Sequence, residues 1–272
     1  MKIKHLLCFI ALCLFFTPGK AQQLSVMTLR NGATVYIWED KSKPDVFGMI
    51  AFKVGSVDDP EQYTGLAHYL EHVMFKGTQT IDALDWEKEK PIYEKIIAKY
   101  DERAALSDPA AREAIDKEIN DLTREAAQYA AGNEFSLLVD HMGGQGLNAS
   151  TGYDQTEYHN SFPPSQLEKW LEIYSERLID PVFRGFQTEL EAVYEEYNMY
   201  NDDRGSRMRE FIYEQAFGDH PYARPIIGLP EHLKNPQLSK LIDFYNTWYG
   251  PQNMSIILVG NIDAKEAIPM IR

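Results

Sequence analysis

The feature that most constrains this chain is a short segment, residues 65–72, which reads Gly-Leu-Ala-His-Tyr-Leu-Glu-His. Its two histidines, His68 and His72, are four residues apart, and Glu71 directly precedes the second. In an α-helix, side chains four residues apart leave the same face about one turn from each other. A helix in this segment would therefore bring two imidazole rings and a carboxylate together.

Apolar residues at helical spacing support that helix. Leu66, Leu70 and Val73 follow one another at intervals of four and three, which is typical of a helix with one buried face. We expect a helix from about residue 64 to residue 76. A chance surface cluster of histidine and glutamate is the alternative, and the apolar face argues against it.

The pattern H-x-x-E-H is the inverted form of the zinc-peptidase motif. Two nitrogens at this spacing can bind one zinc ion at roughly 2.0–2.1 Å. Glu71 can accept a proton from zinc-bound water without being a ligand itself. A catalytic zinc site also needs a third protein ligand and an open position for water.

The N-terminal residues 1–21 have the pattern of a secretory signal peptide: a basic start, an apolar run over residues 6–16, and cleavage expected after Ala21. The apolar run is too short to span a bilayer, and a short N-terminal anchor is the less favoured alternative. We therefore expect a periplasmic or secreted protein. The two cysteines, Cys8 and Cys13, lie inside this segment, so the mature chain is expected to have no disulfide and no cysteine ligand.

The charge of the mature chain restricts its partners further. The signal segment carries three lysines and no acidic residue, so its removal changes the formal charge from −14 to −17. Such acidity disfavours binding along nucleic acid. No later apolar run reaches the roughly 18 residues of a membrane helix, so we expect no membrane span in the mature chain.

The third metal ligand must then be histidine, aspartate or glutamate. The strongest candidates are Glu189 and Glu196, which are two helical turns apart and share one face; Glu191 and Glu195 face elsewhere. An acidic helix is most often a solvated surface, so the other histidines of the mature chain remain open as alternatives. These are His141, His159, His220 and His232.

Helical and strand patterns are mixed along the chain, which predicts an α+β fold with a mixed or antiparallel sheet packed by helices. Residues 85–130 are dense in charged residues and break at Pro109, which predicts an exposed helical hairpin. A solvated face is its usual meaning, with a coiled-coil partner site as the alternative. Strands are expected over residues 25–39 (a hairpin), 45–54, 148–151, 156–162 and 254–259. Further helices are expected over residues 164–179, 186–200, 207–217 and 238–248, and from residue 264.

Several of these segments resemble the pitrilysin (insulinase) family of zinc metallopeptidases. The resemblance includes the H-x-x-E-H motif with its flanking residues 65–67 and 75–78, and the paired glutamates on one helix. It extends to residues 146–151, to residues 220–228 and to residues 249–260, and so covers most of the chain from about Ser25.

The resemblance implies roles for individual residues. It implies that His68, His72 and Glu196 hold a Zn²⁺ ion and that Glu189 supports catalysis. It also implies that the strand at residues 146–151 pairs with an extended peptide substrate as an added strand. That strand includes Asn148, Ala149, Ser150 and Thr151.

The family builds its chamber from two related halves. The resemblance therefore implies a metalloprocessing-peptidase-like half, with residues 22–217 as the zinc-binding domain and residues 218–272 as the beginning of a second, truncated subdomain. A second related half, on the same chain or a separate subunit, is the expected partner. The gap of 124 positions between His72 and Glu196 is longer than usual for the family, which marks residues 85–130 as an insertion.

The combined prediction is an exported zinc endopeptidase that hydrolyses peptides, with Glu71 as general base. One alternative is a non-enzymatic binding or assembly subunit, or a fragment that needs a partner half. Another is a small-molecule lyase with the same inverted motif, resembling the ribosylhomocysteine lyases. That reading is disfavoured because those enzymes use a cysteine ligand, which the mature chain lacks.

Overall fold

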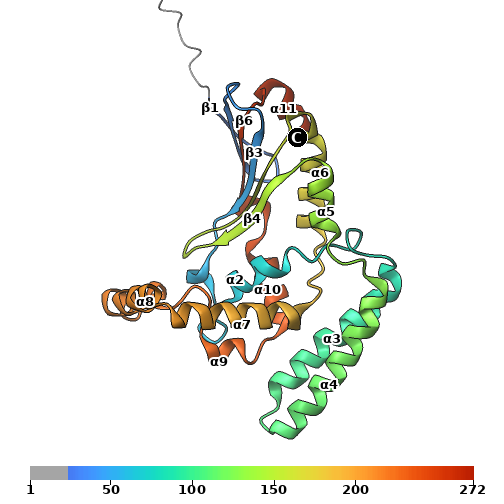
Figure 1. Cartoon of the computed structure of the whole chain (residues 1–272), viewed down its shortest axis with the longest axis vertical. Helices are drawn as coiled ribbons and strands as arrows, with labels where there is room; N and C mark the ends of the chain where they lie inside the picture. The colour runs from blue at the N-terminus through green and yellow to red at the C-terminus, as the bar shows by residue number, and fades with distance from the viewer. Residues whose placement is uncertain (1–23) are drawn as a thin grey trace, which may run out of the picture.

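The computed structural model describes residues 24–272. The expected signal peptide and its cleavage site lie outside the described residues. The upper part of the molecule is a six-stranded mixed sheet (Figure 1). The strand order is β1-β2-β6-β3-β5-β4, and neighbouring strands are antiparallel except for β2 and β6. The strands are β1 Leu24–Thr28, β2 Thr34–Glu39, β3 Val46–Phe52, β4 Gln145–Thr151, β5 Thr156–Phe162 and β6 Met254–Gly260.

Helices lie beside and below the sheet (Figure 1). The expected α+β class is confirmed, and every predicted helix and strand is present, most of them with shifted ends. The helices are α2 Leu66–Val73, α3 Trp86–Ala105, α4 Pro109–Ala126, α5 Glu134–His141, α6 Leu167–Ile179, α7 Phe186–Asp202, α8 Arg204–Phe217, α9 Pro230–Leu233, α10 Leu238–Trp248 and α11 Ala264–Ile271.

One face of the sheet forms the core. In β3 and β5 every second residue is buried, as expected when only one face is tightly covered. Trp170 of α6 stacks on Phe162 of β5, with 5.2 Å between ring centroids. A Cβ atom at Gly48 of β3 would lie 2.7 Å from both rings. Only glycine lets helix α6 approach the sheet this closely.

Helices α3 and α4 form the predicted charged hairpin, which projects from the lower right of the molecule (Figure 1). Pro109 is the first residue of α4, as expected, and Asp108 caps that helix by accepting the N–H of Ala111. The hairpin is less exposed than predicted. Tyr100 is buried, and its ring meets that of Phe186 in α7 edge-on with 4.7 Å between centroids. The base of the hairpin is therefore tied to the helix that carries Glu189 and Glu196.

Two short helices had no predicted counterpart. Helix α5 follows a backbone reversal in which Gly132 and Asn133 have φ values of +75° and +66°, and it buries Phe135 and Val139. Helix α9 spans only four residues. Elements this short carry too few apolar repeats to define a period.

The C-terminal part of the chain contributes a strand to the same sheet. Residues 218–272, expected to begin a second subdomain, contribute β6 to the interior of the sheet, between β2 and β3. Within residues 24–272, the structure has no helix that combines the length and apolarity needed to cross a membrane.

Candidate metal centre and active site

Helix α2, which carries the H-x-x-E-H residues, is held at its N-terminus by a carboxylate from the preceding loop. Asp59 accepts the N–H groups of Gly65 and Ala67 at 2.7 and 2.9 Å, two donors that a helix start leaves without partners. Burial raises the pKa of Asp59 to about 7, although these N–H groups oppose the shift. Gly65 has φ +88°, and a Cβ there would lie 2.5 Å from the carbonyl oxygen of Ile227. This close contact between the backbone at Gly65 and the backbone at Ile227 fixes the direction in which α2 begins.

The three predicted metal ligands lie together. His68 and His72 extend from α2 and Glu196 from α7, and their donor atoms all lie within 4.8 Å of one another. Oε2 of Glu196 is 3.6 Å from Nε2 of His68 and 3.5 Å from Nε2 of His72. Donors bound at 2.0–2.1 Å to a tetrahedral ion stand about 3.3–3.4 Å apart. The donor set and its spacing therefore fit a zinc ion.

The protonation state of the first histidine also suits metal binding. Burial, reinforced by the neighbouring His72, lowers the pKa of His68 to about 4. The ring is therefore neutral at pH 7, the form that coordinates a metal.

Glu189 is not one of the three candidate ligands but contacts one of them, His72. Its Oε2 is 3.5 Å from Nδ1 of His72, and its Oε1 is 2.5 Å from Nζ of Lys76. Burial acts to raise the pKa of Glu189, but the contacts with His72 and Lys76 outweigh it and the pKa is lowered. Glu189 is therefore ionised and can orient His72, as carboxylates behind ligating histidines commonly do.

Glu71 lies on the same helix but outside the group of three ligands. Thr151, at the end of β4, donates its hydroxyl to Oε2 of Glu71 at 2.6 Å. Burial raises the pKa of Glu71, and the Thr151 hydrogen bond and the charge of His72 oppose the rise. A carboxyl group whose pKa is raised above its ordinary value is a better proton acceptor, which is what a general base beside a metal-bound water requires.

The predicted substrate strand is the edge of the sheet. Among residues 24–272, β4 pairs only with β5, so in this part of the chain its other edge is open to a further strand. Asn148 and Ser150 are exposed on it, Ala149 is buried, and Thr151 reaches the site through Glu71.

The alternative histidine ligands do not join the cluster. His232 hydrogen-bonds to Thr64 through Nδ1, and His220 accepts the N–H of Tyr222. His159 lies on the sheet, with its ring 5.4 Å from that of Phe47. His141 ends α5 and is exposed.

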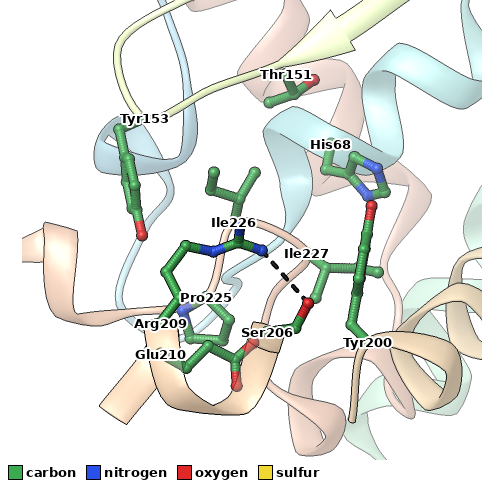
Figure 2. A pocket seen from close by; sticks show the side chains of 10 residues that line it. All are labelled: His68, Thr151, Tyr153, Tyr200, Ser206, Arg209, Glu210, Pro225, Ile226 and Ile227. Atoms are coloured by element: carbon green, nitrogen blue, oxygen red, sulfur yellow. Dashed lines mark hydrogen bonds between the residues drawn. The ribbon is translucent and has the colours of Figure 1, made fainter. Parts of the chain in front are cut away.

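A cavity of about 150 Å³ opens beside His68 (Figure 2). Sequence reasoning singled out Thr151 of β4 but missed the other polar residues of the cavity, which lie just after β4, on α7 and on α8. For Tyr200 a signal existed, since it follows Glu196 by four residues and so shares its helix face. The polar residues of the cavity other than His68 are Thr151, Tyr153, Tyr200, Ser206, Arg209 and Glu210.

Residues 34–90 and 122–229 match the family model described as Insulinase (Peptidase family M16). The chain belongs to peptidase family M16. Residues 237–272 match a second model, the Peptidase M16 inactive domain. The resemblance stated from the sequence is thereby confirmed.

Curated M16 relatives are named zinc proteases. The chain is 25% identical over 263 residues to the probable zinc protease PqqL of Escherichia coli. The matched region covers 92% of this chain and 23% of PqqL. It is 24% identical over 248 residues to zinc protease PqqE of Helicobacter pylori. That matched region covers 90% of this chain and 45% of PqqE. The chain therefore spans less than half the length of either relative.

Solved structures share the M16 fold. A protease from Helicobacter pylori superimposes with a TM-score of 0.70 at 22% identity, over 92% of this chain and 49% of that one. The periplasmic protease PqqL from Escherichia coli superimposes with a TM-score of 0.68 at 25% identity, over 92% of this chain and 23% of PqqL. Pitrilysin superimposes with a TM-score of 0.66 at 22% identity, over 93% of this chain and 22% of pitrilysin.

Proposed function

We propose that this chain is the metal-binding part of an exported zinc endopeptidase that hydrolyses peptides or small unfolded polypeptides. One observation carries the proposal: His68, His72 and Glu196 converge at zinc spacing from segments 124 positions apart. The zinc-protease names of the M16 relatives support the choice of metal. The signal-like pattern of residues 1–21 supports export, and the solved relative PqqL is described as periplasmic.

When bound, zinc supplies Lewis acidity toward a water molecule and the scissile carbonyl oxygen. Glu71 accepts the proton of the attacking water and later donates it to the leaving amine. Thr151 holds the Glu71 carboxylate in place at 2.6 Å. Glu189, fixed by Lys76, orients His72. The open edge of β4 binds the substrate as an added strand, which presents an extended backbone to these groups.

Replacing the general base tests this assignment. Glu71→Gln removes the proton acceptor but none of the three ligands, so we expect full zinc content and a loss of peptide cleavage of about 10²–10⁴-fold. Cleavage of an unstructured peptide and elemental analysis measure the two effects. Glu195→Gln, which neutralises an exposed carboxylate on α7, is the matched control. Normal turnover by the Glu71→Gln protein would exclude Glu71 as the base.

The metal assignment is tested separately. Glu196→Gln is expected to lower zinc content, because it removes the only anionic ligand. Unchanged zinc content would place the third ligand elsewhere.

A second candidate is a half that requires a partner. The chain spans less than half the length of PqqL and PqqE, and its residues 237–272 match the inactive-domain model. Adding the second related half as a separate chain distinguishes the two proposals. Activity that appears only in the mixture supports the partner-dependent form.

We also propose that the charged hairpin is an insertion in the M16 domain. The family model matches residues on either side but not residues 91–121. Deleting residues 91–121 with a short linker is expected to preserve zinc binding; a loss of zinc binding in a folded deletion protein would contradict the proposal.

A further inference from the structure

The cavity beside His68 contains a charged group that the proposed reaction does not use. Arg209 of α8 lines it, together with Tyr153, Tyr200 and Ser206. Figure 2 shows the guanidinium group reaching into the middle of the cavity. Because it lines the same cavity as His68, it is a candidate to contact substrate.

The guanidinium group has few partners of its own. Nη2 of Arg209 is 3.4 Å from Oγ of Ser206, a long contact, and Arg209 makes no ion pair with any residue in the described range 24–272. The neighbouring Glu210 also lines the cavity but does not pair with it, and Figure 2 shows its carboxylate lower, alongside α8. Asp203 is engaged with the N–H of Ser206 at 2.7 Å. Most of the five N–H donors of Arg209 therefore remain available.

The ring of Tyr153 packs against α8 itself, because Tyr213 belongs to that helix. The ring of Tyr153 stacks on that of Tyr213 at 5.4 Å and 12°, and it packs against Tyr222 at 4.7 Å. Tyr153 follows β4 by two residues. A peptide added along the edge of β4 alternates its side chains between two faces, so a group close to the scissile bond would lie over this cavity.

We propose that the cavity is a carboxylate-binding subsite in which Arg209 forms paired hydrogen bonds with a carboxylate of the substrate. The inference rests on the proposed peptidase function and specifies its substrate class. A planar guanidinium matches the two oxygens of a carboxylate. A cavity of roughly 150 Å³ can hold a group the size of benzene, so an acidic side chain fits. The carboxylate comes from an aspartate or glutamate side chain or from a nearby peptide C-terminus.

Binding to the zinc-loaded Glu71→Gln protein tests the subsite without requiring turnover. The probes are fluorescent unstructured peptides with amidated C-termini that carry either glutamate or glutamine at each position in turn. We expect about tenfold tighter binding of glutamate at one position. Arg209→Met is expected to abolish that preference. Arg207→Met is expected to keep it, because Arg207 is exposed on α8 as Arg209 is but does not line the cavity. Zinc content and circular dichroism of both variants check that they fold.

A second arm identifies the source of the carboxylate. It compares the glutamine peptides with free and with amidated C-termini, and an Arg209-dependent gain from the free terminus alone assigns the cavity to C-terminal carboxylates. Equal affinities throughout, the same result for Arg209→Met and Arg207→Met, or no binding of any peptide overturns the subsite. Selective binding without cleavage, both by the unsubstituted chain alone and by its mixture with the second related half, would instead contradict the peptidase function. Cleavage without the preference would contradict only the subsite.

Discussion

Replacing Glu189 by glutamine measures how much the carboxylate behind His72 contributes to metal binding. The substitution keeps the shape of the side chain but removes its charge. It also leaves Lys76, now 2.5 Å from Oε1 of Glu189, without its anionic partner. His72 would lose the carboxylate that fixes its ring and favours metal binding through Nε2.

The expected loss follows from the geometry. Removing such a carboxylate typically lowers metal affinity 10–100-fold. The contact between Nδ1 of His72 and Oε2 of Glu189 is 3.5 Å, longer than the 2.7–3.2 Å of a strong hydrogen bond. We therefore expect the lower end of the range, about tenfold, which corresponds to about 1.4 kcal/mol.

Competition with a chromophoric zinc chelator measures the dissociation constant directly and does not depend on turnover. Glu195→Gln is the matched control because it removes the same charge from the exposed side of the same helix. We expect the control to bind zinc as the unsubstituted chain does. If the two variants bind zinc equally well, Glu189 does not act through His72, and the assignment fails.

Other predictions concern the base, the helix start and the hairpin. Thr151→Val removes the hydroxyl that lowers the pKa of Glu71, so the acidic limb of the kcat/KM profile is expected to move to higher pH; an unmoved limb would contradict this. The pKa of Asp59 is raised from 3.8 to about 7 on folding, so its contribution to stability is full below pH 3.8 and is lost as the pH rises through 7, by up to about 4 kcal/mol. Asp59→Asn is expected to reduce this fall of the unfolding free energy with pH, measured by urea titrations at several pH values. An unchanged fall would contradict the role given to Asp59. Tyr100→Ala removes the ring that packs against Phe186 and is expected to lower the unfolding free energy by about 3–5 kcal/mol. A decrease below about 1 kcal/mol, measured by calorimetry, would mean that the hairpin is not anchored there.

Local periodicity was sufficient to predict most of the secondary structure. The helix at residues 64–76, the two charged helices and the hairpin at residues 25–39 all appear, because each has enough apolar residues to define a period. The short helix α5 was missed for the opposite reason. The order of strands was not predictable, since β6 enters between β2 and β3 from more than 200 residues away.

The candidate site was predictable only in part. Residue chemistry alone left Glu189, Glu196 and four histidines as possible third ligands, and the family resemblance selected Glu196. Glu196 lies against His68 and His72 because α7 packs on α2. Arg209 had no sequence signal, because α8 and the residues after β4 meet only through the fold.

The sequence by itself determined that His68, Glu71 and His72 share one helix face, because that relation depends only on the local geometry of consecutive peptide units. The tertiary structure decided that Glu196 lies against both histidines, that β4 is an edge strand of the sheet over residues 24–272, and that Arg209 lines the same cavity as His68. Those features depend on packing between segments far apart in the chain, where each position is set by the sum of many contacts and by no local pattern.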